Sequence, residues 1–277
     1  MIEQSVRNYL LPRAFNAAVR AGAEIMKVYN SRDSYDIKVK SDNTPLTVAD
    51  RLAHNKIKEV LGETRIPILS EEGREMQFDE RKNWDMFWLV DPLDGTIEFI
   101  KGNNEFTVNI ALMADNECVG ALVYVPYLGK MYVAEQGCGA MLLDGITPSE
   151  ESDYTDEDIR AKAQSLPLAS SVHDNFRIAV SRSHQTAETA EYVARMRELH
   201  PEAEVVEQGS SYKFCLMAEG SIDYYPRTTA TYEWDTAAAE LILVESGGLV
   251  RSLPDHRPLR YNKENLHNPW FECHRFK

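Results

Sequence analysis

Hydrophobic residues near the start of the chain recur at the spacing of helices. Between residues 12 and 29 they repeat at the helical period, which predicts an amphipathic helix. Residues 38–45 are polar and predict a loop. A second helix is expected after Thr47, because Asp50 follows three residues later, as in a capping box. The residues of this helix that we expect to face the core are Leu52, Ile57, Val60 and Leu61.

Short apolar runs in the next part of the chain predict β-strands. Residues 66–69 and 87–90 are two such runs, each followed by polar turn residues. Further runs with turn signals between them predict an antiparallel meander formed by residues 107–113, 117–125, 130–134 and 140–143. The first half of the chain, residues 1–147, is therefore expected to have an α+β structure.

The pattern changes after residue 147. Residues 148–168 are acidic and have little periodicity, which we interpret as a surface insertion or linker between two halves. Beyond this segment strands alternate with helices, as is typical of an α/β region. The expected strands are 177–180, 203–206, 222–225 and 248–251, and the expected helices are 188–199, 211–218 and 235–245. Residues 169–277 form the predicted second half.

Composition and charge say little about the fold, but they restrict which partners the protein can bind. The chain has 277 residues, of which 43% are hydrophobic and 27% charged, as in an ordinary globular protein. Its formal net charge of −14 disfavours binding to a nucleic acid polymer or an anionic membrane by bulk electrostatics. A small anionic substrate could still be held by bound metal and a few local cations.

The lack of recognisable targeting signals and the scattered cysteines together predict a cytoplasmic location. No apolar run approaches the length of a membrane-spanning helix, and the amino terminus lacks the pattern of a secretory signal. The four cysteines are scattered without paired zinc spacing, so we expect reduced thiols. Peripheral association with the inner membrane, and the choice between a monomer and a homodimer, are left open by the sequence.

The segment from Trp88 to Thr96 carries the strongest chemical signal. An apolar strand is expected to end at Val90, and the proline and glycine that follow Asp91 predict a turn there. Asp91 and Asp94 would then lie on one turn and converge on one point, where their oxygens would suit a hard cation such as Mg²⁺. Other acidic residues just after a strand or near a helix start are Glu71, Glu72, Asp50 and Asp235.

Electrostatics favours a metal if these carboxylates meet. Two carboxylates about 4 Å apart repel by roughly 4 kcal/mol at an effective dielectric constant of 20. Several together require protonation or cations, and two Mg²⁺ ions about 3.5–4 Å apart would suit phosphoryl chemistry. Each residue also has a simpler interpretation: Glu72 as a solvated neighbour, Asp50 as a helix cap, and Asp235 as an N-cap that could still bind metal through its second oxygen.

The motifs around these carboxylates resemble a known superfamily. Ser70-Glu-Glu72, Trp88-Leu-Val-Asp-Pro-Leu-Asp-Gly-Thr96 and Trp234-Asp-Thr-Ala-Ala238 are similar to motifs of the inositol monophosphatase superfamily of metal-dependent, lithium-sensitive phosphatases. Other motifs resemble its bacterial branch of CysQ-type 3′(2′),5′-bisphosphate nucleotidases. They are Glu98-Phe-Ile100, Glu105-Phe-Thr-Val-Asn-Ile-Ala-Leu112, Ser181-Arg-Ser-His184, Gly209-Ser-Ser-Tyr-Lys-Phe-Cys215 and Tyr225-Pro-Arg227.

The resemblance implies a fold, a reaction and a set of metal ligands. The fold would be the layered α-β-α-β-α sugar-phosphatase fold. The reaction would be hydrolysis of the 3′-phosphate of adenosine 3′,5′-bisphosphate to AMP and phosphate, in sulfur assimilation or nucleotide salvage, with two or three Mg²⁺ ions. Glu71 would bind metal, Asp91 would bridge two ions, the carbonyl of Leu93 would bind the first ion, and Asp94 and Asp235 would bind the second.

The same resemblance implies residues that act on the substrate. Thr96, with Glu71 or Asp50, would orient the attacking water, and the Asp94-Gly95-Thr96 turn would hold the scissile phosphate through backbone N–H groups. The metal ligands would therefore also contact the substrate. His184, Ser210, Lys213 and Arg227 would bind the nucleotide and its second phosphate. Simpler interpretations are a helix-start role for His184 and an exposed helical position for Lys213.

Two departures from the branch and two other functions are weighed beside this interpretation. Ile97 stands where the branch usually carries lysine, and the segment after Pro148 has no recognised counterpart. An inositol or sugar-phosphate monophosphatase would use the same metal chemistry. A nonhydrolytic nucleotide sensor would use the same ligands, but it would not need the candidate water-activating groups Thr96, Asp50 and Glu71.

Overall fold

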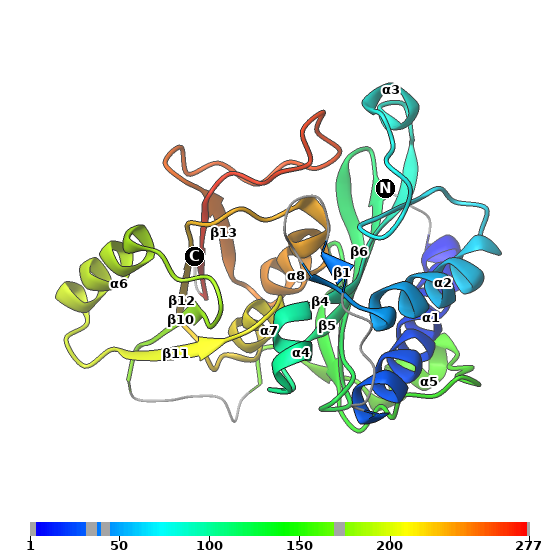
Figure 1. Cartoon of the computed structure of the whole chain (residues 1–277), viewed down its shortest axis with the longest axis horizontal. Coiled ribbons are helices and arrows are strands. Elements are labelled where there is room, and N and C mark those ends of the chain that lie inside the picture. The colour runs from blue at the N-terminus through cyan, green and yellow to red at the C-terminus, as the bar shows by residue number, and fades with distance from the viewer. Residues whose placement is uncertain (1–3, 32–37, 40–44, 169–174, 276–277) are drawn as a thin grey trace.

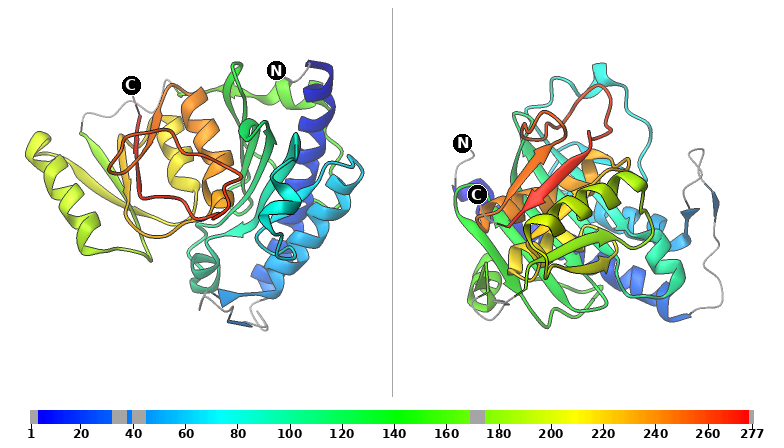
Figure 2. Two further views of the ribbon diagram at one scale, coloured as in Figure 1. Left: turned by 90° about the horizontal axis from the view of Figure 1, so that it is seen from above. Right: turned by 90° about the vertical axis from the view of Figure 1, so that its left-hand side faces the viewer.

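Helices and sheets alternate in layers across the molecule. The protein is described by a computed structural model in which residues 4–31, 38–39, 45–168 and 175–275 are placed. From one side to the other there are helices, a sheet, helices, a second sheet and a helix (Figures 1 and 2). This arrangement confirms the predicted α-β-α-β-α fold. No helix in the placed ranges is both long and apolar enough to cross a membrane.

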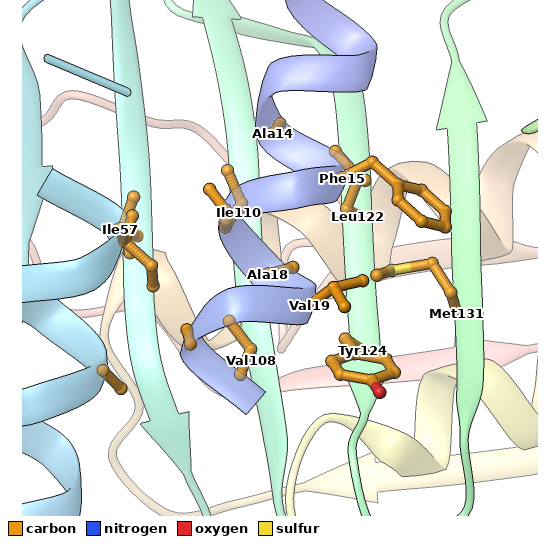
Figure 3. Close-up of a cluster of buried hydrophobic side chains, with 14 of the residues drawn as sticks. Ala14, Phe15, Ala18, Val19, Ile57, Val108, Ile110, Leu122, Tyr124 and Met131 are labelled. Carbon is orange, nitrogen blue, oxygen red and sulfur yellow. The ribbon is translucent and has the colours of Figure 1, made fainter. Parts of the chain in front are cut away.

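The first layer covers the outer face of the first sheet. It contains α1 (Gln4–Ser31), α2 (Val48–Gly62) and α5 (Asp156–Lys162). Phe15 and Val19 of α1 lie against Leu122 and Met131 of the sheet (Figure 3). The predicted start of α1 at residue 12 is wrong, because the helix runs through Pro12 and begins at Gln4.

The predicted inward orientation of Leu52 in α2 is also wrong. Leu52 is 37% exposed, whereas Ile57, Val60 and Leu61 are buried as predicted. The inner face of α2 starts with Ala49 and Ala53, whose small side chains let the helix lie close to its neighbours. Leu52 therefore projects away from the core.

The first sheet has the strand order β3-β4-β5-β6-β7-β8-β9. The bounds are β3 (Ile68–Ser70), β4 (Met86–Asp94), β5 (Thr107–Ala114), β6 (Glu117–Val125), β7 (Lys130–Glu135), β8 (Gly139–Leu143) and β9 (Gln164–Ser165). The predicted meander is confirmed, because β5 to β8 are antiparallel neighbours in chain order. Helices cover both faces, which explains why these strands read as continuous apolar runs rather than alternating ones.

The middle layer lies between the two sheets and carries part of the site. It contains α7 (Tyr212–Glu219) and α8 (Glu233–Glu245), with the short helix α4 (Thr96–Lys101) beside them. Helix α8 contacts β4 to β8 of the first sheet and β13 (Leu249–Ser252) of the second. Its apolar side chains are buried in the core that joins the two sheets.

The second sheet has the strand order β11-β10-β12-β14-β13, with α6 (Ala187–Leu199) on its outer side. The remaining bounds are β10 (Arg177–Ser181), β11 (Glu204–Gln208), β12 (Tyr224–Arg227) and β14 (Phe271–His274). The parallel pairing of β10 with β11 and β12 confirms the predicted α/β pattern. Strand β14, which the sequence pattern did not predict, runs antiparallel between β12 and β13.

Three segments contain helices or strands that the sequence pattern did not predict. The predicted loop 38–45 contains the short paired strands β1 (Lys38–Val39) and β2 (Pro45–Leu46), while residues 40–44 lie outside the described ranges. Helix α3 (Phe78–Arg81) lies before β4. Residues 148–168 contain α5 and β9, and Ile159 of α5 is buried against the first layer. The division of the chain into halves on either side of this segment stays a prediction.

Candidate active site

A β-bulge in β4 places two carboxylates on the same side of the first sheet. Asp91 pairs with Asn109 and Asp94 with Thr107, so three steps along β4 face two steps along β5. In a regular strand residues three apart point to opposite faces, and the extra residue of a bulge removes that difference. The predicted end of the strand at residue 90 is therefore wrong, because Asp91 and Asp94 belong to β4 itself.

Three carboxylates from separate elements converge beside this bulge. Glu71 follows β3, Asp91 lies in β4 and Asp235 lies in the first turn of α8. One oxygen from each side chain lies within 4.8 Å of the others. The backbone N–H of Glu71 donates to the carbonyl of Val90 over 3.1 Å, which fixes the end of β3 against β4.

The expected N-cap position of Asp235 is wrong, although a capping role is present. The helix begins at Glu233, and Tyr232 is the capping residue. Asp235 Oδ2 accepts a hydrogen bond of 2.8 Å from the backbone N–H of Tyr232. The carboxylate thus supports the start of the helix with one oxygen while its side chain lies among the other acids.

Burial makes this cluster unfavourable without a counter-charge. Asp91 is 1% exposed, and burial raises its pKa well above the ordinary value, with Glu71 raising it further. Burial also raises the pKa of Asp235, and the charge of Asp94 adds to the effect. Asp91 is buried and Glu71 and Asp235 are half-buried, and three carboxylates this close together need protons or a cation. Because every donor is an oxygen, the group fits a hard divalent ion such as Mg²⁺.

Asp94 lies in the same cleft but is held differently. Its Oδ2 accepts a hydrogen bond of 2.5 Å from the backbone N–H of Ser211 at the start of α7. Burial raises the pKa of Asp94, while Lys213 and the Ser211 hydrogen bond act in the opposite direction. Asp94 is therefore a neighbour of the compact carboxylate cluster and not one of its members.

Thr96 and Asp50 are joined beneath the cleft. The hydroxyl of Thr96 lies 3.2 Å from Asp50 Oδ1 and 3.3 Å from the carbonyl oxygen of Leu93. Asp50 Oδ2 accepts hydrogen bonds from the backbone N–H and the hydroxyl of Thr47, over 2.8 and 2.6 Å. The predicted capping box is confirmed. Asp50 is 2% exposed and both caps its helix and contacts Thr96.

One cleft of about 420 Å³ contains the other predicted site residues. Gly95 adopts a left-handed conformation with φ of 88°, and a Cβ there would lie 2.9 Å from the carbonyl oxygen of Glu105. Only glycine fits this close approach without strain. The predicted residues that line the cleft are Glu71, Asp91, Leu93, Asp94, Gly95, Thr96, His184, Ser210, Lys213, Arg227 and Asp235.

The part of the cleft lined by Lys213 and Arg227 is cationic. Lys213 is 2% exposed, so the alternative of an exposed helical lysine is wrong. Its ammonium donates to the carbonyls of Gln208 and Ser210 over 3.2 and 2.6 Å and lies 5.1 Å from the ring centre of Tyr225. Burial, followed by the charge of Arg227, lowers the pKa of Lys213 to about 7.

Several residues of the site had no role in the sequence interpretation. Tyr232 and His267, with ring centres 4.2 Å apart, line the cleft beside Asp235. Glu98 is 3% exposed, lines the cleft and accepts a hydrogen bond of 2.7 Å from Ser183. Glu98 and Ser183 lie inside motifs recognised in the sequence, and this was the only signal for them. Ile97, which departs from the bacterial branch, also lines the cleft.

The fold and this acidic cleft are those of a metal-dependent phosphatase family. The sequence profile of the inositol monophosphatase family matches residues 7–269, and the chain belongs to that family. Within the family, it is 37% identical to the 3′(2′),5′-bisphosphate nucleotidase CysQ of Escherichia coli K12, over 95% of this chain and 98% of that protein. The Salmonella typhimurium protein of the same name is 38% identical over the same shares.

Solved structures agree with this assignment. The crystal structure of CysQ from Bacteroides thetaiotaomicron has 45% sequence identity and a TM-score of 0.86, covering 95% of each chain. Inositol monophosphatase II from Staphylococcus aureus has a TM-score of 0.70 at 19% identity, covering 96% of this chain and 89% of that one. The second likeness concerns the fold alone.

Proposed function

We propose that this protein is a Mg²⁺-dependent phosphatase that hydrolyses the 3′-phosphate of adenosine 3′,5′-bisphosphate to AMP and phosphate. The name of its Escherichia coli relative, 3′(2′),5′-bisphosphate nucleotidase, supports a substrate of this class. The structural observation that carries the proposal is that one cleft is lined both by the carboxylate cluster and by the cations Lys213 and Arg227. A substrate with two phosphates could use both sets of residues at once.

The carboxylates would hold the metal. Glu71, Asp91 and Asp235 offer oxygens within 4.8 Å of one another, and Asp94 and the carbonyl of Leu93 line the same cleft. Two or three Mg²⁺ ions, when bound, would activate a water molecule and stabilise the charge on the leaving oxygen. The raised pKa values of Asp91 and Asp235 fit such a role, because a cation would offset both the burial and the neighbouring negative charges that raise them.

Thr96 and Asp50 would orient the attacking water. The hydroxyl hydrogen of Thr96 is directed toward Asp50 and Leu93, which leaves the lone pairs of the hydroxyl oxygen to accept a hydrogen bond. A water that donates to Thr96 would present its own lone pair to the phosphorus. Glu71, which lines the same cleft, is the alternative acceptor.

The turn at Gly95 would hold the scissile phosphate. Gly95 is the N-cap of α4, so the backbone N–H groups of the first turn of this helix have no partner within the helix. N–H groups of this kind favour phosphate oxygens. The left-handed conformation of Gly95 turns the chain there, next to Asp94.

The second phosphate would lie against Lys213, Arg227 and Ser210, with His184 at the rim. Arginine can bind phosphate oxygens in a bidentate manner, and lysine supplies a point charge. A monophosphate site has no need for this pair of cations. The pair therefore favours a bisphosphate over inositol 1-phosphate, the substrate of the alternative function.

The experiment that tests the proposal compares two substrates. Purified protein with Mg²⁺ should release phosphate from adenosine 3′,5′-bisphosphate faster than from inositol 1-phosphate, and Li⁺ should inhibit the release. The Arg227→Ala variant should lose activity on the bisphosphate more than on inositol 1-phosphate. Preference for inositol 1-phosphate would support the monophosphatase instead. Tight binding of the bisphosphate without release of phosphate would identify a nucleotide sensor.

A further inference from the structure

The position of Asp94 depends on a turn contributed by the second half of the chain. The only hydrogen bond recorded for the Asp94 carboxylate within the described ranges comes from the backbone N–H of Ser211. The hydroxyl of Ser211 lies 2.8 Å from both Thr107 Oγ1 and Asn109 Oδ1 of β5. Residues 208–211, here called the site turn, connect β11 to α7. The site turn also supports Asp94 through the Ser211 N–H.

The site turn lies closely against the connection between β4 and β5. Ser210 adopts a left-handed conformation with φ of 51°, which is uncommon for serine. A Cβ on Gly209 would lie 2.3 Å from Glu98 Cγ and 3.0 Å from the carbonyl oxygen of Glu105. The turn therefore needs its present backbone path, and any displacement would move the Ser211 N–H away from Asp94.

The carboxylate of Glu105 fixes this turn. Its Oε2 accepts hydrogen bonds of 2.8 Å from the backbone N–H of Gly209 and from Arg182 Nε. Its Oε1 accepts a second hydrogen bond from the same guanidinium, over 2.7 Å. Arg182 also donates to the carbonyl of Glu207 over 2.7 Å. Glu105 is mostly buried, with 15% of its side chain exposed, and bidentate pairs of this kind are geometrically specific.

The same turn also positions Lys213, one of the two cations that line the cleft. Lys213 donates to the carbonyls of Gln208 and Ser210, so the ammonium is positioned by the turn that Glu105 holds. Loss of the Glu105 carboxylate would therefore disturb proposed metal binding through Asp94 and proposed phosphate binding through Lys213. A residue that only stabilised the fold would have no such paired effect.

We propose that Glu105 is a positioning residue that holds the site turn so that Asp94 presents its carboxylate to the metal. The metal role of Asp94 rests on the proposed function. Partners that orient a metal ligand from outside the coordination sphere typically contribute tenfold or more to metal affinity. Glu105 does not line the cleft, so its effect would be transmitted through Gly209 and Ser211.

The test measures Mg²⁺ binding directly. Isothermal titration calorimetry of the metal-free Glu105→Ala protein with MgCl₂ should give a dissociation constant about tenfold higher than that of the parent. Glu105→Gln keeps an oxygen acceptor for Gly209 and should show a smaller increase. At saturating Mg²⁺ the kcat of Glu105→Ala should recover most of its loss, because positioning and not chemistry has been lost, whereas KM for the bisphosphate should stay raised through Lys213.

Glu207→Gln is the matched control. Glu207 also contacts Arg182, over 3.4 Å, but its carboxylate makes no hydrogen bond to the site turn among the described residues. This variant should bind Mg²⁺ like the parent. Parent-like Mg²⁺ binding in a folded Glu105→Ala protein would overturn the proposal, and so would failure of both Glu105 variants to fold. If the parent binds Mg²⁺ and Glu105→Ala weakens it, but the bisphosphate is not hydrolysed, the proposed function fails and the positioning role stands.

Discussion

The hydroxyl of Thr96 lies 3.2 Å from Asp50 Oδ1, and this hydrogen bond connects residues 46 positions apart in the chain. Asp50 belongs to α2 in the outer layer, whereas Thr96 begins α4 beside the cleft. The other oxygen of Asp50 is used by Thr47. One buried carboxylate therefore joins the start of a helix to the residue proposed to orient water.

The two roles of Asp50 can be separated by mutation. Asp50→Asn should lower kcat by about 100-fold, because the Thr96 hydroxyl loses its charged acceptor, and general acid–base groups contribute about that much or more. Thr47→Ala should instead lower the free energy of unfolding by about 1 kcal/mol through loss of the cap, with kcat little changed. Steady-state kinetics and denaturant unfolding of both variants check this. Equal effects of the two variants on kcat would contradict a direct role of Asp50.

Asp91→Asn should nearly abolish turnover without unfolding the protein. A bridging ligand that loses its charge weakens binding toward each ion, and a loss of about 3–4 kcal/mol corresponds to a roughly 100- to 1000-fold fall in rate. The metal-free variant should melt no lower than the metal-free parent, since the change removes a charge from a buried acidic cluster. Kinetics with Mg²⁺ and thermal melting in chelator provide the two measurements. Near-normal turnover would show that the metal assignment is wrong.

Mg²⁺ should stabilise the folded protein. A ligand at about 100 times its dissociation constant adds about 2.7 kcal/mol, which corresponds to a rise in melting temperature of roughly 5 °C for a chain of this size. Thermal melting of chelator-treated protein before and after addition of MgCl₂ measures the rise. Asp91→Asn provides the comparison and should show a much smaller rise.

The rise in melting temperature caused by Mg²⁺ should be larger at pH 8 than at pH 5.5. Asp91 and Asp235 have raised pKa values in the folded metal-free protein, so the folded state holds protons that the unfolded state has already released. Stability of the metal-free protein therefore falls as the pH rises above the unfolded value of about 4 toward the raised values. Protons also compete with the metal at low pH. A larger rise at pH 5.5 would contradict this account.

Affinity for a second phosphate should fall above pH 7. The pKa of Lys213 is lowered to about 7 by burial, so its ammonium loses its proton as the pH rises past that value. KM for adenosine 3′,5′-bisphosphate should then increase by up to about tenfold per pH unit. Adenosine 3′-monophosphate, which lacks the second phosphate, is the control substrate. In Lys213→Arg the guanidinium stays charged, so the pH dependence of KM should flatten.

Local sequence patterns identified the candidate metal-binding residues but did not predict how the fold orients them. The motif from Trp88 to Thr96 identified Asp91 and Asp94 as neighbours, but not the bulge that turns them to one side. A bulge depends on register with the partner strand β5, and a single-strand pattern carries no register. Leu52 was misplaced for a similar reason, because the inward face of α2 is decided by what packs on it.

Local sequence patterns also did not predict which of the acidic residues lie together. The cluster contains Glu71, Asp91 and Asp235, whereas Asp94 is held by Ser211. Strand β14 was missed because its short run follows a long irregular segment, and its place between β12 and β13 is a long-range pairing. Glu105 stood within a recognised motif, but its contacts with Arg182 and Gly209 join distant parts of the chain.

By itself the sequence determined the chemical character of the protein: oxygen donors after strands, a glycine where the backbone must turn, and cations placed far from them along the chain. These follow from residue type and short-range spacing, which act over a few bonds. The tertiary structure alone decided which carboxylates share a point, which way the bulged strand presents them, and which backbone N–H holds Asp94. Such choices depend on packing between layers, because the distances that govern charge and hydrogen bonding are set by residues far apart in the chain, such as Glu71 and Asp235, which are 164 positions apart.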